Sequence, residues 1–311
     1  MRKAFIATLE KLAEDNERVM LLTADVGYSV LESFAEKFPD RFYNVGVAEQ
    51  NMVGIATGLA EAGFIPFVYS IATFVSLRAY EFIRNGPILH KYPVRIIGAG
   101  GGFEYGHAGI THHALEDIGV MRLQHGITVI APADYKQASN ALLGTWNLDG
   151  PVYYRIGKDD KLTVPGLNGR FELGHTQLLS KGDDLLFIAM GSIAIEVVRA
   201  AEILKGHDIS CTVVIVASLE PSPIDDLIEV LSRFRLVFTV EAHYVKGGLG
   251  SLISEIVADN NINCKVKRCG VNTMPTGSSG SQAYYYKKYA LSGEMLADIA
   301  LRDFLHEGKE E

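Results

Sequence analysis

The chain has 311 residues and a formal net charge of −8 at pH 7, and 48% of its residues are hydrophobic. This length suffices for two domains that each bury a core, and the composition fits a soluble α/β protein. The acidic balance and even spread of Arg and Lys argue against nucleic acid as the main partner, and no apolar run reaches the roughly 20 residues of a membrane-spanning helix.

The first half of the chain predicts one doubly wound domain over residues 1–165. Residues 1–20 have the spacing of an amphipathic helix and not the apolar core of a signal peptide. Strands are predicted at 19–24, 65–69, 94–98, 128–131 and 152–156. Helices are predicted at 29–37, 48–62, 73–84, 115–123 and 134–147. This alternation is typical of a parallel sheet with crossover helices.

The second half predicts a smaller α/β domain over residues 183–311. A polar, glycine-containing stretch precedes it, and we interpret residues 166–182 as a linker. Strands are then predicted at 185–190, 211–216, 236–240 and 265–269, with one helix ending near Leu204 and a closing helix at 293–304. The three cysteines are Cys211, Cys264 and Cys269, an odd number without zinc-like pairing. They are expected to be core or subsurface residues in a reducing cytoplasm.

One carboxylate stands out in the segment Gly46–Gly63. If a helix begins near Ala48, Glu49 shares its buried face with positions that carry Met, Val, Ala, Leu and Ala. Desolvation penalises the charged form of a carboxylate there, so the group pairs, caps the helix or exchanges a proton with a ligand. A first-turn glutamate stabilised by the helix dipole is the alternative interpretation.

Other polar residues follow the predicted strands, where ligands of open parallel sheets bind. Asp25 and Ser29 follow the first strand and Arg155 ends the fifth. The loop 98–113 follows the third strand, and it holds six glycines and the three histidines His107, His112 and His113. Their spacing does not match a zinc site, so catalytic imidazole is favoured over a metal ligand, with an ordinary mobile loop as the alternative.

Two further features are expected to be structural. The turn Gly247–Ser251 opens a helix but lacks the surrounding dinucleotide-binding fingerprint, so we interpret it as a packing turn. The tyrosines at 284, 285, 286 and 289 are expected to pack in the domain or to line a chain interface.

Five segments together resemble the C-terminal half of transketolase. They are ADVGYS at 24–29, VAEQNMVGIATG at 47–58, ATFVSLRAYEFIR at 72–84, GITHHALEDIGVMR at 109–122 and VIAPAD at 129–134. The resemblance covers essentially the whole chain and implies a pyrimidine-binding domain followed by the transketolase C-terminal domain. Deoxyxylulose-phosphate synthase and the β subunit of 2-oxo acid dehydrogenase E1 share this architecture.

The resemblance implies thiamine diphosphate as the cofactor. Glu49 matches the glutamate that hydrogen-bonds the aminopyrimidine ring of this cofactor and favours its reactive tautomer. Phe74 matches the first aromatic residue of the pyrimidine pocket, and Tyr80 is expected to line that pocket as well. Leu77 falls where transketolases often carry a stacking aromatic residue, and Asp25 matches an acidic residue near the cofactor.

The resemblance also implies a phosphorylated sugar as substrate. Ser29 and Arg155 match positions that hold its phosphate, His112 matches the histidine beside the reacting carbon, and His107 is expected to contact substrate too. Two departures change the expected specificity. Ala108 replaces the Asp that binds a donor hydroxyl in transketolases, and residues 100–102 provide no counterpart of a second, upstream histidine.

A further motif of the family does not occur in this sequence. Transketolases hold the cofactor's diphosphate through Mg²⁺ bound by a GDG motif and a later Asn in an N-terminal domain, and this chain contains no GDG. The resemblance therefore implies a split enzyme. A second, diphosphate-binding subunit would supply most of the Mg²⁺ site, and the active site would form between chains of a heterotetramer.

The leading hypothesis is thus an enzyme subunit, the C-terminal half of a split transketolase that moves a two-carbon ketol unit from a ketose phosphate, or a modified sugar, to an aldehyde. The first alternative is decarboxylative transfer from pyruvate, as in deoxyxylulose-phosphate synthase or an E1 β subunit. The second alternative is a non-catalytic structural subunit. A dinucleotide-dependent oxidoreductase is excluded because the phosphate-binding fingerprint does not follow the first strand.

Overall fold

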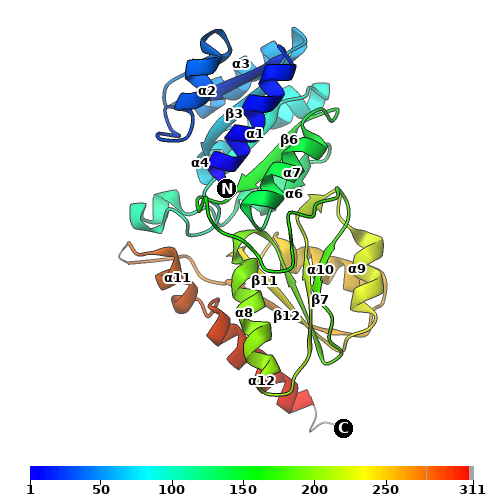
Figure 1. Ribbon diagram of the computed structural model, residues 1–311. Coiled ribbons are helices and arrows are strands. Elements are labelled where there is room, and N and C mark those ends of the chain that lie inside the picture. The colour runs from blue at the N-terminus through cyan, green and yellow to red at the C-terminus, as the bar shows by residue number, and fades with distance from the viewer. Residues whose placement is uncertain (278, 308–311) are drawn as a thin grey trace.

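The computed structural model describes residues 1–277 and 279–307, which form two α/β sheets placed one above the other (Figure 1). The first sheet has seven strands in the order β10-β5-β6-β4-β3-β1-β2. The second has five strands in the order β12-β11-β8-β9-β7. Most pairings in both sheets are parallel, so the predicted class of two α/β domains with largely parallel sheets is confirmed.

The first sheet is covered by helices on both faces. Its strands are β1 (Val19–Thr23), β2 (Phe42–Asn44), β3 (Ile65–Ile71), β4 (Arg95–Ala99), β5 (Thr128–Ile130), β6 (Val152–Ile156) and β10 (Ser218–Glu220). Its helices are α1 (Arg2–Asp15), α2 (Glu32–Lys37), α3 (Glu49–Glu61), α4 (Ala72–Arg78), α5 (Tyr80–Ile83), α6 (Asp117–Arg122) and α7 (Tyr135–Thr145). Short helical turns are η1 (Pro39–Arg41), η2 (Arg84–Ile88), η3 (Gly106–Ala108) and η4 (Ile110–His112).

Alternation along the strands explains the two covered faces. On β3, Val68 joins the apolar cluster under α3 and α4, whereas Phe67 and Tyr69 join the cluster under α1 and α7. Every residue of β3 is buried, as expected for a parallel strand between two helical layers. Figure 1 shows α1 and α7 side by side on one of these faces.

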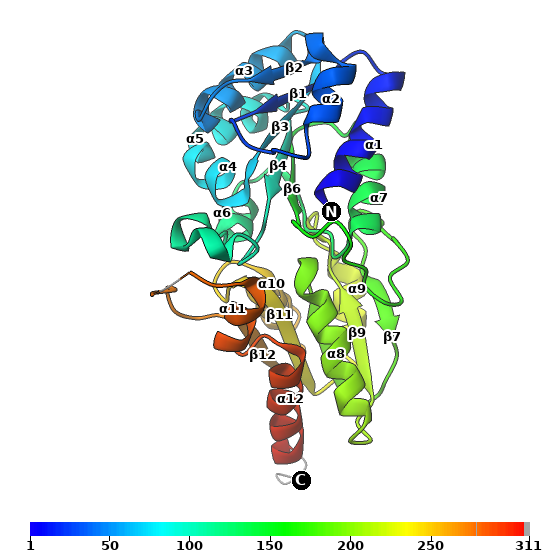
Figure 2. The ribbon, with the colours of Figure 1, turned by 60° about the vertical axis from the view of Figure 1, so that its left-hand side comes forward.

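The second sheet has the same layered plan. Its strands are β7 (Gln177–Ser180), β8 (Leu185–Ala189), β9 (Cys211–Ile215), β11 (Leu236–Tyr244) and β12 (Lys265–Val271). Its helices are α8 (Ala194–Lys205), α9 (Ile224–Leu231), α10 (Leu249–Asp259), α11 (Gln282–Lys288) and α12 (Gly293–Glu307), with a short turn η5 (Gly191–Ile193). The helices α8 and α12 pack together on one face, and α9 and α10 pack on the other (Figure 2).

Three strands lie where the sequence did not predict them. The short strand β2 pairs parallel with β1 at one edge of the first sheet. The strand β7 falls inside the segment interpreted as a linker, and it pairs antiparallel with β9 at the edge of the second sheet. The strand β10 follows β9 in the chain but pairs antiparallel with β5 of the first sheet, with Ser218 opposite Ile130. The second half of the chain therefore supplies an edge strand to the first sheet.

The helix predicted over residues 73–84 is interrupted. The helix α4 ends at Arg78, α5 begins at Tyr80, and the chain continues as the π-type turn η2, which contains Pro87. Proline removes a backbone donor and clashes with the preceding turn, which explains the irregular hydrogen bonding. No helix within residues 1–277 and 279–307 is both long and apolar enough to cross a membrane.

Candidate functional site

Glu49 is the first residue of α3, and its side chain is only 2% exposed. Its Oε1 accepts a hydrogen bond of 3.0 Å from Ser70 Oγ on β3. Its Oε2 lies 2.9 Å from Arg78 Nη1 at the end of α4. The carboxylate is therefore buried, hydrogen-bonded and charge-paired, as a buried anion requires.

The predicted start of this helix is confirmed, and so is its buried face except at Leu59, which is half-buried. Ala48 is its N-cap residue, and the residues buried on the inner face are Glu49, Met52, Val53, Ala56 and Ala60.

The loop that leads into α3 is tied to the end of β1. Asn44 Oδ1 accepts the backbone N–H groups of both Asp25 and Gly46, and Asn44 Nδ2 donates to Asp25 Oδ1 at 2.8 Å. Asp25 has a φ of 56° and is exposed. Asparagine and aspartate accept such local bonds and conformations more readily than most residues. The structure therefore places Asp25 beside the loop that positions Glu49.

Arg78, Phe74 and His112 extend the cluster from Glu49. Phe74 and Arg78 are four residues apart in α4, so their side chains share one face of the helix. The Arg78 guanidinium carbon lies 4.0 Å from the centroid of the Phe74 ring. The His112 ring meets the Phe74 ring edge-on, with 5.0 Å between centroids. Contacts thus run without a break from Glu49 through Arg78 and Phe74 to His112.

A hollow of about 370 Å³ opens beside this cluster, between the two domains. The first domain contributes helix α4 and the histidine-containing loop, and the second domain contributes Tyr244, Met274 and Pro275. The lining residues from the first domain are Thr73, Phe74, Leu77, Arg78, Ile110, Thr111, His113, Leu115 and Glu116. The mixture of apolar walls with a few polar groups is typical of small-molecule sites.

The three histidines of the loop have different surroundings. His107 is exposed on η3. His112 is half-buried, and its Nδ1 lies 3.0 Å from Thr111 Oγ1. His113 is buried, with its ring edge-on to Phe103 at 5.1 Å and to Tyr285 at 4.8 Å. Burial lowers the pKa of His113, so this ring is neutral near pH 7.

Arg155, which was predicted to be a phosphate ligand, is engaged in internal contacts in this structure. Arg155 is 5% exposed, and its Nε donates to Asp117 Oδ2 at 2.9 Å. Its Nη2 donates to the carbonyls of Ala114 and Ala242, each at 2.9 Å. Burial opposes the guanidinium charge, but Asp117 and Tyr153 more than offset this effect, so the pKa of Arg155 lies above its usual value. Arg155 holds the two domains together and does not line the hollow.

The structure also places Ser29 and Tyr80 outside this hollow. Ser29 lies in a different hollow with Glu10 and Glu32, and its backbone N–H donates to Glu32 Oε1 at 2.7 Å. Lys3 also lines that hollow, and Lys37 pairs with Glu10 at 2.7 Å, so the phosphate contact of Ser29 stays a prediction. Tyr80 lines a separate hollow with Arg84 and His125, because the helix breaks at Ala79 between it and Arg78.

The two features expected to be structural have that role. The carboxylate of Glu241 accepts the N–H groups of Leu249 and Gly250, each at 2.8 Å, so two amides of the Gly247–Ser251 turn bind an internal acid. In the tyrosine cluster, Tyr285 stacks on Phe103 with 4.5 Å between centroids.

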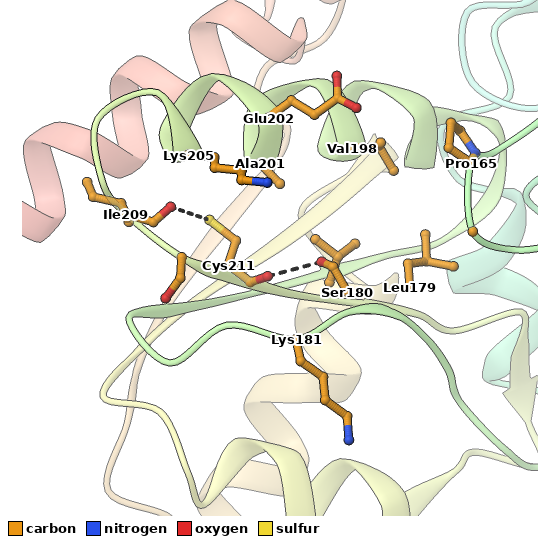
Figure 3. A pocket seen from close by; sticks show the side chains of 13 residues that line it. Pro165, Leu179, Ser180, Lys181, Val198, Ala201, Glu202, Lys205, Ile209 and Cys211 are labelled. Carbon is orange, nitrogen blue, oxygen red and sulfur yellow. Dashed lines mark hydrogen bonds between the residues drawn. The ribbon is translucent and has the colours of Figure 1, made fainter.

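A larger hollow of about 430 Å³ lies within the second domain, between α8 and the strands β7 and β9 (Figure 3). Its walls are mainly apolar, with Lys181 and Glu202 among the lining residues. Figure 3 shows Cys211 in this hollow, with its thiol directed toward the Ile209 carbonyl. Burial raises the pKa of Cys211 to about 12, which makes the thiol a poor nucleophile. The candidate catalytic groups therefore gather beside Glu49 and not here.

Sequence reasoning missed the ion-pair partner of Glu49. Arg78 lies one helical turn after Phe74, and this spacing was the available signal. Ser70 and Asp117 gave no local signal, because their partners, Glu49 and Arg155, are far from them in the sequence. Within residues 1–277 and 279–307, no group of three His, Cys, Asp or Glu side chains is arranged to hold a metal ion.

Both domains match known protein families. Residues 1–160 match the transketolase pyrimidine-binding domain, and residues 174–295 match the transketolase C-terminal domain. The chain therefore belongs to the transketolase family, of which it carries these two domains.

Individual relatives place the chain more narrowly. It is 38% identical to a putative transketolase C-terminal section of Methanocaldococcus jannaschii, over 99% of this chain and 97% of that protein. It is 32% identical to one of the subunits of the apulose-4-phosphate transketolase of Actinobacillus succinogenes, over 86% of each. A solved structure described as "Split gene transketolase, inactive beta4 tetramer" is 33% identical with a TM-score of 0.86, over 98% of this chain and 97% of that chain. The chain is thus homologous to the C-terminal subunits of split transketolases.

Proposed function

We propose that this chain is the C-terminal subunit of a split, thiamine-diphosphate-dependent transketolase. The observation that carries the proposal is the buried Glu49 carboxylate, which is paired with Arg78. Arg78 in turn stacks on the Phe74 ring, and both Arg78 and Phe74 line the hollow between the domains. The enzyme would transfer a two-carbon ketol unit from a ketose phosphate, or a modified sugar, to an aldehyde. The family of the chain and its likeness to a subunit of a sugar-phosphate transketolase support this reaction class.

The residues present fit the aminopyrimidine end of the cofactor. Glu49 offers a carboxylate oxygen to a ring nitrogen, Phe74 offers a ring face, and Leu77 adds apolar surface. Asp25 supports the loop before Glu49. When bound, thiamine diphosphate supplies the nucleophilic carbon of its thiazolium ring. Glu49 would share a proton with the pyrimidine nitrogen and so hold the ring in its reactive tautomer.

The histidine-containing loop would supply the contacts to the substrate. His112 is half-buried against Phe74, where it can donate a hydrogen bond to the substrate oxygen nearest the reacting carbon. His107 is exposed on the same loop and is a candidate for contact with the outer part of the sugar. Because Arg155 is engaged at the domain interface, the phosphate requires other groups.

A second type of subunit would complete the enzyme. We assign the diphosphate and most of the Mg²⁺ coordination to that subunit, in a heterotetramer. One relative is named as a transketolase subunit, and another is described as an inactive β4 tetramer, so a different partner chain fits both. The three free cysteines favour a reducing compartment, and we assign the enzyme to the cytoplasm.

Exchange of Glu49 tests the proposal. In the assembled complex, Glu49→Gln should lower turnover by roughly 10² or more, because the amide cannot share its proton with the ring in the same way. Assembly, followed by size-exclusion chromatography, should not change. Glu61→Gln at the exposed end of the same helix is the matched control. Unchanged turnover in Glu49→Gln would remove Glu49 from the mechanism and favour a structural subunit.

Ala108 favours a second candidate reaction, decarboxylative transfer from pyruvate. It stands on η3 where sugar transketolases carry a hydroxyl-binding Asp, so a donor without that hydroxyl, such as pyruvate, suits the site as well. Release of CO₂ from pyruvate by the assembled complex would favour decarboxylative transfer over ketol transfer.

A further inference from the structure

We propose that Arg78 is an internal competitor of the cofactor: in the chain without cofactor, its guanidinium occupies the place that the aminopyrimidine ring takes in the working enzyme. The inference rests on the proposed function, because it requires Glu49 and Phe74 to be contacts of that ring. It identifies a residue that must move before the cofactor binds.

The guanidinium makes the two contacts that such a ring needs. Its Nη1 lies 2.9 Å from Glu49 Oε2, and its central carbon lies 4.0 Å from the centroid of the Phe74 ring. A guanidinium is planar and delocalised, it donates N–H groups in its own plane, and it stacks on aromatic faces. An aminopyrimidine ring is also planar and nitrogen-rich. The same carboxylate and the same aromatic ring can therefore hold either group.

The two groups compete because Arg78 covers Glu49 from the solvent side. The side chain of Glu49 is 2% exposed, whereas that of Arg78 is 44% exposed. The other oxygen of the carboxylate accepts from Ser70, which is fully buried on β3. A ligand that arrives from the hollow thus meets Arg78 before it reaches Glu49.

Arg78 is also placed so that it can leave. It is the last residue of α4, and the helix is interrupted directly after it at Ala79. It lines the hollow that opens between the domains, so its long side chain can swing into solvent there. One partly exposed ion pair and one cation–π contact are weak contacts, so their loss should change affinity about tenfold.

The test is the affinity of the assembled complex for thiamine diphosphate at fixed Mg²⁺, measured by isothermal titration calorimetry. Arg78→Met keeps an unbranched apolar side chain and removes the charge and the N–H donors. We expect its Kd to be about tenfold lower than that of the wild type. Arg78→Gln keeps a planar donor without the charge and should fall between the two. Arg233→Met is the matched control, because Arg233 also stacks over a phenylalanine, Phe234, but in the second domain.

Each other outcome overturns the inference. If both Arg78 variants keep the wild-type Kd within about twofold while the wild type binds, Arg78 does not compete. If the variants bind more weakly, Arg78 holds the bound ring and does not block it. If wild-type and variant complexes all fail to bind thiamine diphosphate, the proposed function fails, and the inference fails with it.

Discussion

Replacement of Arg155 by methionine tests whether this residue is structural. Arg155 is the second-to-last residue of β6 in the first domain, and its guanidinium contacts Asp117 and the carbonyls of Ala114 and Ala242. Ala242 lies on β11 of the second sheet, so one side chain bridges the two domains. Arg155→Met keeps most of the apolar stem and removes every one of these hydrogen bonds.

The expected loss of stability is large because Asp117 stays behind. Its side chain is 0% exposed, and after the exchange its remaining partner is the Tyr153 hydroxyl at 2.8 Å. Loss of one partner of a buried ion pair costs about 3–5 kcal/mol. Whole domains are stable by about 5–15 kcal/mol, so this cost is a large share. Asp117→Leu in the same chain should recover most of it, because the uncompensated charge is then gone.

Urea unfolding followed by circular dichroism and by the fluorescence of Trp146, the single tryptophan, measures this loss. Arg302→Met on the exposed side of α12 should change the free energy of unfolding by no more than about 0.5 kcal/mol. If Arg155→Met instead keeps the wild-type stability while the KM for a phosphorylated substrate rises, the structural assignment of Arg155 is refuted. Arg155 would then be a phosphate ligand.

Three further predictions concern buried groups. Because burial lowers the folded-state pKa of His113, its stabilising contribution is present above about pH 6.5 and is lost as the pH falls through the folded pKa. Urea titrations from pH 7 to 5 should show a shallower loss in His113→Gln, by up to about 1.4 kcal/mol per pH unit, and equal slopes would contradict this. Glu241→Gln should lower the free energy of unfolding, measured in urea, by about 1–3 kcal/mol. A glutamine side chain has one acceptor oxygen, whereas the two oxygens of Glu241 each accept one N–H group. A variant as stable as the wild type would refute the capping role. Iodoacetamide at pH 8 should label Cys264 before Cys211 and Cys269, whose burial raises their pKa to about 12, and peptide mass spectrometry that found Cys211 first would count against this.

The sequence predicted what depends on local periodicity. The start of α3 and the burial of Glu49 follow from apolar residues at helical spacing, and the structure agrees. Most parallel strands were also predicted within about two residues, because buried strands are short, nearly continuous apolar runs. The three-residue strand β10 is too short to show a period, and its partner lies in the other domain.

The contacts of the candidate site depended on long-range packing. Arg155 was correctly placed at a strand end, but the strand end does not reveal that Asp117 and a carbonyl of the second domain surround it. Arg78 was overlooked for the opposite reason. Its sequence position was informative, yet its contact with Glu49 needs the side chain to fold back over Phe74. Side-chain direction at a domain boundary is set by both domains together.

The strand β10 limits how this protein can be divided. A fragment that ends near residue 165 would leave the edge of β5 bare, with the carbonyl of Ala217 no longer bound to the Ala131 amide at 2.7 Å. An uncovered strand edge invites pairing with other molecules, so such a fragment should aggregate when it is expressed alone. The boundary between the sheets is therefore a poor place to cut the gene, and the two halves are best handled as one unit of expression.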